Sequence, residues 1–121
     1  MARTTRDLRY LLGDLIQWGE KTERVLDGTS SDAIGGDEKT LLALERAVEI
    51  VGEICGRLLT QFPEWSAQVD DDDLRDAYRT RNKLAHGYED VSAELLYQIA
   101  RDDVAALTAK ARRWLADLDA G

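Results

Sequence analysis

Apolar residues recur along this chain at intervals of three and four, the spacing that places them on one face of an α-helix. The pattern predicts four helices, over residues 5–26, 37–61, 72–85 and 92–118. No segment alternates between apolar and polar positions, so the sequence predicts no β-strand. The second helix has the broadest apolar face, which includes Leu41, Leu44, Val48, Val51, Cys55 and Leu58.

Capping and helix-breaking residues mark the ends of these segments. Thr4 followed by Asp7 resembles a capping box before the first helix, and Ser92 is a favourable N-cap for the fourth. Pro63 cannot continue the second helix, which is therefore expected to end just before it. Residues 27–36 are rich in Gly, Ser and Asp and are predicted to form a loop.

Together these segments predict an all-α fold, an antiparallel four-helix bundle. A chain of 121 residues fits one domain, 1–121. Gly52 and Gly56 lie four residues apart on the second helix and are expected to let a neighbouring helix approach closely. Trp18 lies off the main apolar stripe of the first helix, where it forms either a second packing face or a contact with a partner.

The charge balance limits the classes of function. Hydrophobic residues make up 44% and charged residues 33% of the chain, and the net charge is −8. Such acidity argues against broad nucleic-acid binding, which depends on neutralising phosphates. It leaves room for a local basic site, because salt screens charges beyond about 8–10 Å. No apolar run reaches the roughly 18 residues of a membrane span, and no signal peptide is recognisable, so we expect a cytoplasmic protein.

Two features that could suggest chemistry have simpler interpretations. Cys55 is the only cysteine and lies within an apolar helical pattern, which favours a buried hydrophobic role over a catalytic thiol. Residues 70–73 are four consecutive aspartates, which is not the spacing of calcium or other metal ligands. We expect them to form a solvated N-cap and first turn, where carboxylates meet the positive end of the third helix.

The most informative stretch is residues 81–88, at the end of the third helix, with the sequence Arg-Asn-Lys-Leu-Ala-His-Gly-Tyr. It holds His86, the only histidine of the chain. Arg81 falls on the apolar side of the helix, whereas His86 shares a second stripe with Arg75, Arg79 and Asn82. Arg81 and His86 are therefore about 140° apart around one straight helix. Either the helix unwinds before Gly87, or two chains present the motif to each other across a dimer axis.

Each of these residues also has an ordinary structural interpretation. A histidine at a helix end is most often structural or simply exposed. An arginine on an apolar stripe most often forms a buried ion pair, here with Glu49 or Glu53 of the second helix. Tyr88 can be a plain aromatic residue at a helix end.

The chemistry that the residue types would suit is metal-independent cleavage of RNA. The ribose 2′-hydroxyl is the nucleophile, so the protein needs only a proton-transfer group and a cation. Imidazole, with a reference pKa of about 6.5, suits the first role, and His86 is the only such group. The guanidinium of Arg81 suits the second, because it stays charged and stabilises a phosphorane. Arg75, Arg79 and Lys83 would add positive charge for the RNA backbone.

These features resemble the HEPN superfamily, and more narrowly its HepT-like ribonuclease toxins. The resemblance rests on Arg-x4-His-x-Tyr at Arg81, His86 and Tyr88, with Asn82 directly after the arginine. The second-helix stretch 44–53 and the segment 62–65, Phe-Pro-Glu-Trp, also resemble the family. The resemblance implies a HEPN-like bundle acting as a homodimer, with Arg81 and His86 catalytic at the dimer cleft and no cofactor.

The resemblance further implies an RNA substrate and a toxin–antitoxin pair. The implied antitoxin is a cognate nucleotidyltransferase of the MntA type, which can transfer AMP to Tyr88. An AMP group beside the cleft would add negative charge and bulk that oppose RNA binding. Two alternatives stay open at this point. One is a non-catalytic HEPN module that binds a nucleotide or a partner protein, and the other is a purely structural bundle.

Overall fold

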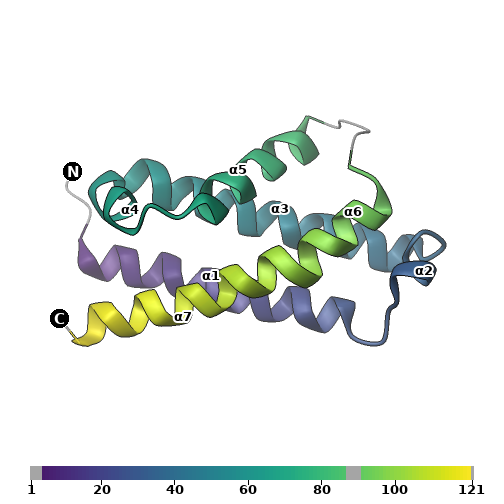
Figure 1. Cartoon of the computed structure of the whole chain (residues 1–121), viewed down its shortest axis with the longest axis horizontal. Coiled ribbons are helices and arrows are strands. Elements are labelled where there is room, and N and C mark those ends of the chain that lie inside the picture. Colours follow the sequence, from purple (N-terminus) through teal and green to yellow (C-terminus); the bar gives the residue numbers. More distant parts are fainter. Residues whose placement is uncertain (1–3, 87–90, 121) are drawn as a thin grey trace.

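A computed structural model describes residues 4–86 and 91–120. Within these ranges the protein contains helices and no strand. The long helices are α1 (Thr5–Leu26), α3 (Glu38–Gln61), α5 (Asp72–Ala85) and a final segment made of α6 (Ala93–Gln98), a π-helical stretch η1 (Ile99–Val104) and α7 (Ala105–Ala120). Each long helix runs in the direction opposite to the one before it, so the all-α antiparallel bundle is confirmed (Figure 1).

The predicted helix boundaries agree closely with the structure. Thr4 caps α1 through a capping box with Asp7, and the side chain of Ser92 accepts a hydrogen bond from the Leu95 N–H at the start of α6. Asp37, predicted as the first residue of the second helix, is its N-cap, with its side chain accepting from the Thr40 N–H. Side-chain oxygens at these positions replace hydrogen bonds that the first turn of a helix lacks.

Two connections contain short helices that the sequence did not predict. The expected loop includes α2 (Ser31–Ile34), where Ser30 caps the turn and Ile34 is buried in the core. The second helix does end at Gln61, but α4 (Pro63–Val69) then begins directly with Pro63 as its first residue. Proline fits that position because the first residue of a helix needs no N–H partner. Trp65 of α4 packs edge-on against Trp114 of α7, with ring centroids 5.4 Å apart.

The core lies where α1 packs against both α3 and α7. Helix α5 makes its main contacts with α3 alone, and Leu74 is its fully buried residue. The helix that carries residues 81–86 therefore lies at the edge of the bundle. The largest fully buried side chains are those of Leu12, Leu15, Ile34, Leu44, Leu58, Leu74, Leu96 and Leu107.

None of the described helices is long and apolar enough to cross a membrane. Cys55 has the buried hydrophobic role that the sequence predicts. Its side chain is fully buried, and this burial raises the pKa of the thiol. Trp18 is half-buried and packs against the core, with the Lys21 ammonium 4.1 Å from the centroid of its ring. One side of Trp18 is thus a packing face and the other borders the surface.

Candidate active site

The first half of α5 balances its charges internally. Asp71 is the N-cap, and its side chain accepts a hydrogen bond from the Asp73 N–H. Arg75 forms ion pairs with Asp72 and, at 3.3 Å, with Asp70. The hydrogen bond from Arg75 lowers the pKa of Asp72 below its usual value. The expected N-cap and acidic first turn are therefore confirmed.

The acidic run is more than a solvated face, however. Lys110 of α7 places its Nζ 2.8 Å from Asp71 Oδ2 and 2.7 Å from Asp73 Oδ2. The side chains of Lys110 and Asp71 are largely buried, with 27% and 16% of their surfaces exposed. This three-residue cluster joins the start of α5 to α7. The expectation that the aspartates are merely solvated is wrong for Asp71 and Asp73.

Two of the arginines expected to attract RNA are engaged with carboxylates. Arg79 lies 2.6 Å from Asp76, and Arg75 is held by Asp70 and Asp72. Both arginines are on the stripe that also carries Asn82 and His86. The positive charges of Arg75 and Arg79 are therefore largely neutralised by these aspartates on the surface of α5.

Arg81 occupies a different environment. A Cβ added at Gly52 of α3 would lie 2.4 Å from the Cβ of Arg81 and 2.5 Å from the Ala77 carbonyl oxygen, so only glycine allows α5 this close. The Nε of Arg81 is buried and has no hydrogen-bond partner. Its Nη1 donates to Asn82 Oδ1 at 3.1 Å. The sequence placed Arg81 on the apolar side of the helix, and in the structure this side faces α3.

The ion pair that was considered for Arg81 does not form. Glu49 pairs with Arg46 at 2.6 Å, and Glu53 pairs with Arg57 at 3.6 Å. Within the described part of the chain, no carboxylate pairs with the Arg81 guanidinium. A half-buried cation is thus left with one neutral amide as its acceptor, and it retains its capacity to bind an anion.

His86 lies at the C-cap of α5. Its backbone has φ −88° and ψ 2°, and its N–H donates to the Asn82 carbonyl oxygen at 3.1 Å. Its side chain is exposed, as is that of Lys83 one turn earlier. The helix therefore does not unwind before His86, which disfavours convergence of Arg81 and His86 within one chain. Tyr88 lies outside the described residues.

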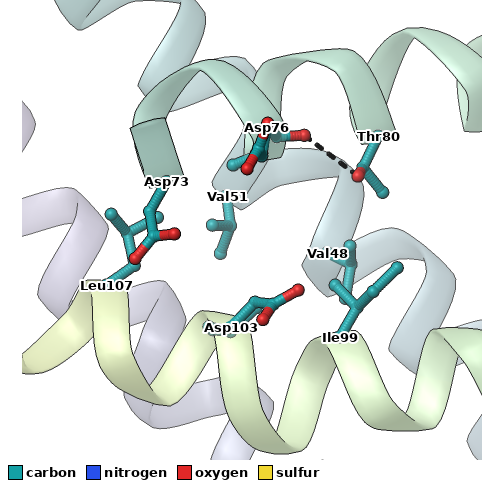
Figure 2. Close-up of a pocket in the computed structure, with 10 residues that line it drawn as sticks. Val48, Val51, Asp73, Asp76, Thr80, Ile99, Asp103 and Leu107 are labelled. Carbon is teal, nitrogen blue, oxygen red and sulfur yellow. Dashed lines mark hydrogen bonds between the residues drawn. The ribbon is translucent and has the colours of Figure 1, made fainter. Parts of the chain in front are cut away.

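A cavity of about 70 Å³ opens on the other side of α5, towards η1 (Figure 2). Its lining includes the apolar side chains of Val48 and Ile99, and Asp73, Asp76 and Asp103 line it from α5 and η1. Partial burial and the neighbouring carboxylates raise the pKa of Asp103. This cavity would repel a phosphate. Within residues 4–86 and 91–120, no group of three or more His, Cys, Asp or Glu side chains is placed to hold a metal ion.

Sequence reasoning did not identify Lys110 or Asp103 as neighbours of α5. Neither has a local signal, because each lies on the final helical segment and reaches α5 only through the fold. The π-helical stretch η1, which carries Asp103 towards the cavity, was also not predicted. Its residues continue the apolar period of the flanking helices, so the pattern alone does not distinguish it from an α-helix.

A helical bundle with Arg-x4-His at the end of its third long helix defines a HEPN-type protein. The match with known families is more specific: residues 16–114 fit the family described as ribonuclease HepT-like. The chain belongs to this HepT-like family. It is also similar to a protein named "Probable ribonuclease HepT" from Thermococcus cleftensis, with 31% identity over 74 residues. That alignment covers 61% of this chain and 64% of the relative. No solved structure matches the chain significantly.

Proposed function

We propose that this protein is a metal-independent endoribonuclease in which Arg81 and His86 carry out the reaction. The observation that supports this most is the state of Arg81. Its guanidinium is half-buried, has no carboxylate partner among the described residues and has an unbonded Nε. A cation held in this way binds a developing phosphorane more strongly than a solvated one would. Membership of a ribonuclease family supports RNA as the substrate.

In the proposed reaction, the 2′-oxygen of a ribose attacks the adjacent phosphorus and the bond from phosphorus to the 5′-oxygen breaks. A base takes the proton of the 2′-hydroxyl, and an acid gives one to the departing 5′-oxygen. Imidazole can act in either role near neutral pH. Arg81 stabilises the charge on the non-bridging oxygens, and Asn82 orients Arg81 through the 3.1 Å hydrogen bond.

We further propose that the site is shared between two chains. The chain has one histidine, whereas the base and the acid are needed within one reaction. Because α5 stays helical through Ala85, Arg81 and His86 of one chain remain about 140° apart around its axis. A two-fold axis near the end of α5 would place the Arg81 of one chain beside the His86 of its partner and bring both histidines to one cleft.

The test is cleavage of a structured RNA in the presence of EDTA. We expect the wild-type protein to cleave and His86→Ala to lose about 10²–10⁴-fold in rate. Equal cleavage by the two proteins would point to a contaminating nuclease, and no cleavage by either would leave the protein as a non-catalytic HEPN module.

The dimer is tested separately. Light scattering should give twice the chain mass of 13.6 kDa.

Regulation by a nucleotidyltransferase antitoxin of the MntA type is part of the same proposal. The enzyme would join the α-phosphate of ATP to the Tyr88 oxygen and release pyrophosphate. Tyr88 follows His86 by two residues, so an attached AMP would bring negative charge and bulk to the end of α5. Mixing the two proteins with ATP should raise the intact mass by AMP units, and Tyr88→Phe should prevent the increase. Modification that persists in Tyr88→Phe would reject this role for Tyr88.

A further inference from the structure

A shallow groove lies between α1 and α3, on the side of α3 that does not carry α5. Its volume is about 470 Å³, and its lining includes Trp18, Lys21 and Arg24 of α1 and Arg46 of α3. The remaining lining residues are apolar, and none is acidic. The chain has a net charge of −8, yet the lining of this groove contains three cations and no carboxylate.

Two of the three cations of this groove have no carboxylate partner among the described residues. Lys21 lies over the ring of Trp18, and neither Lys21 nor Arg24 forms an ion pair within the described residues. Arg46 is the exception, because it pairs with Glu49 at 2.6 Å, as Arg79 does with Asp76. Lys21 and Arg24 differ in this respect from Arg75, Arg79 and Arg101, which are all held by nearby aspartates.

The antiparallel topology places this groove near the end of the bundle where the proposed site lies. Arg24 is in the last turn of α1, and Arg46 is in the first half of α3. Helix α1 ends, α3 begins and α5 ends at the same end of the bundle (Figure 1). A single RNA strand that reaches His86 therefore has a cationic surface available at this end of the molecule.

We propose that this groove, through Lys21 and Arg24, binds the phosphate backbone of the RNA substrate away from the scissile bond. The inference rests on the proposed ribonuclease function and concerns substrate binding, not the chemical step. An acidic protein needs such a surface because its mean field repels RNA, while charges within about 8–10 Å of a phosphate still attract it. Trp18 fixes the position of Lys21 by the cation–π contact.

The test compares two double variants with the same change in net charge. Lys21→Gln/Arg24→Gln removes two groove cations. Arg6→Gln/Arg113→Gln removes two cations from the other end of the bundle, where α1 begins and α7 ends. Binding is measured with a 2′-O-methyl oligonucleotide, which lacks the nucleophile, and cleavage is measured separately with RNA. Circular dichroism melting confirms that both variants fold.

We expect the groove variant to raise the Kd and KM about tenfold with kcat within about twofold. The dependence of log Kd on log salt should become shallower by about 1.4, because each lost single-strand phosphate contact removes about 0.7. The control pair should stay within about twofold of the wild type, and Lys21→Arg/Arg24→Lys should restore binding because the charges return.

The outcomes separate this inference from the proposed function. Equal losses in both double variants, or none in either, would overturn the groove as an RNA site. Weaker binding of the antitoxin with unchanged RNA binding would also overturn it and assign the groove to a protein partner. Wild-type protein that binds the uncleavable oligonucleotide through the groove but never cleaves RNA would reject the catalytic proposal and leave the groove standing.

Discussion

Gly52 of α3 and Arg81 of α5 are in direct contact, and the contact depends on the absence of a side chain at Gly52. A Cβ there would lie 2.4 Å from the Cβ of Arg81, closer than real Cβ contacts occur. Packing of this kind lets the two helix backbones approach each other and sets the distance of Arg81 from the α3 backbone. It also explains how Arg81 Nε becomes buried while Nη1 still reaches Asn82.

Gly52→Ala should therefore displace α5 and move Arg81 away from its position. Overpacking costs about 1–3 kcal/mol of stability, and a misplacement of about 1 Å in a catalytic group can reduce the rate up to 10²-fold. We expect a lower Tm and a loss of RNA cleavage larger than the loss of folded protein. The measurements are thermal melting and kcat at a temperature where the variant is fully folded.

Gly13→Ala is the matched control for this change. Gly13 lies in α1, and nothing is within 4 Å of a Cβ built there. Alanine at an open helical position stabilises by up to about 1 kcal/mol, because glycine is the poorer helix former. An equal loss of cleavage in Gly13→Ala and Gly52→Ala would contradict the role assigned to the Gly52–Arg81 contact.

Lys110 should stabilise the start of α5. Lys110→Met keeps most of the side-chain volume but leaves Asp71 and Asp73 without their cation, at a cost of about 1–3 kcal/mol. The exposed pair of Arg9 and Asp119 provides the comparison, and Arg9→Met should cost less than about 1 kcal/mol. Urea unfolding measures both changes, and equal costs would show that the cluster has no special weight.

The same cluster predicts a pH dependence at high pH. Hydrogen bonds to Asp71 and Asp73 raise the pKa of Lys110 above 10.5. The folded state therefore holds this proton more tightly than the unfolded chain, so the stabilisation is complete below pH 10.5 and disappears as the pH rises through the raised value. The stability difference between wild type and Lys110→Met should shrink over that interval. A difference that grows there would contradict the assignment.

Asp103→Asn should stabilise the protein at neutral pH. Partial burial, followed by the charges of Asp73, Asp102 and Asp76, raises the pKa of Asp103 above 3.8. The folded state thus favours the protonated form, and stability falls as the pH rises through the raised value. An uncharged amide avoids this loss. We expect a higher Tm at pH 7 and no difference from the wild type below about pH 3.8, the ordinary value for this group.

The neighbouring residue provides a control of opposite sign. Arg101 hydrogen-bonds Asp102 and lowers the pKa of that carboxyl below 3.8. Asp102 therefore contributes stability above its ordinary pKa, and this is lost as the pH falls through the lowered value. Asp102→Asn should lower the Tm at pH 7. A stabilising effect of both amides would indicate a general benefit from reducing the negative charge.

Local signals in the sequence were sufficient for most of the fold. The periodic segments predicted α1 and α5 to the residue, and the side chains of Thr4 and Ser92 cap the helices as expected. The four-residue α2 was missed because its stability comes from burying Ile34, which is a tertiary contact with no periodic signal. Pro63 was interpreted as a helix end, although it also begins α4.

The candidate site was predictable in its residues but not in its charges. The helical wheel placed Arg81 on the apolar side of its helix, since angular position follows from spacing alone. The spacing did not show that Arg75 and Arg79 would be held by aspartates three residues away, or that Glu49 and Glu53 would pair within α3 instead of with Arg81. A charged side chain can have several possible partners nearby. Which pair forms depends on the three-dimensional positions of the side chains, which the spacing of residues does not give.

A heterodimer of two inactive variants tests the shared site most directly. Arg81→Ala and His86→Ala chains carrying different affinity tags are coexpressed, and the mixed dimer is isolated by two successive purifications. If Arg81 of one chain acts with His86 of its partner, the mixed dimer retains one complete pair and should cleave RNA at least about tenfold faster than either parent homodimer. Cleavage no faster than that of the parents, in a mixed dimer that forms and remains folded, would contradict the shared site.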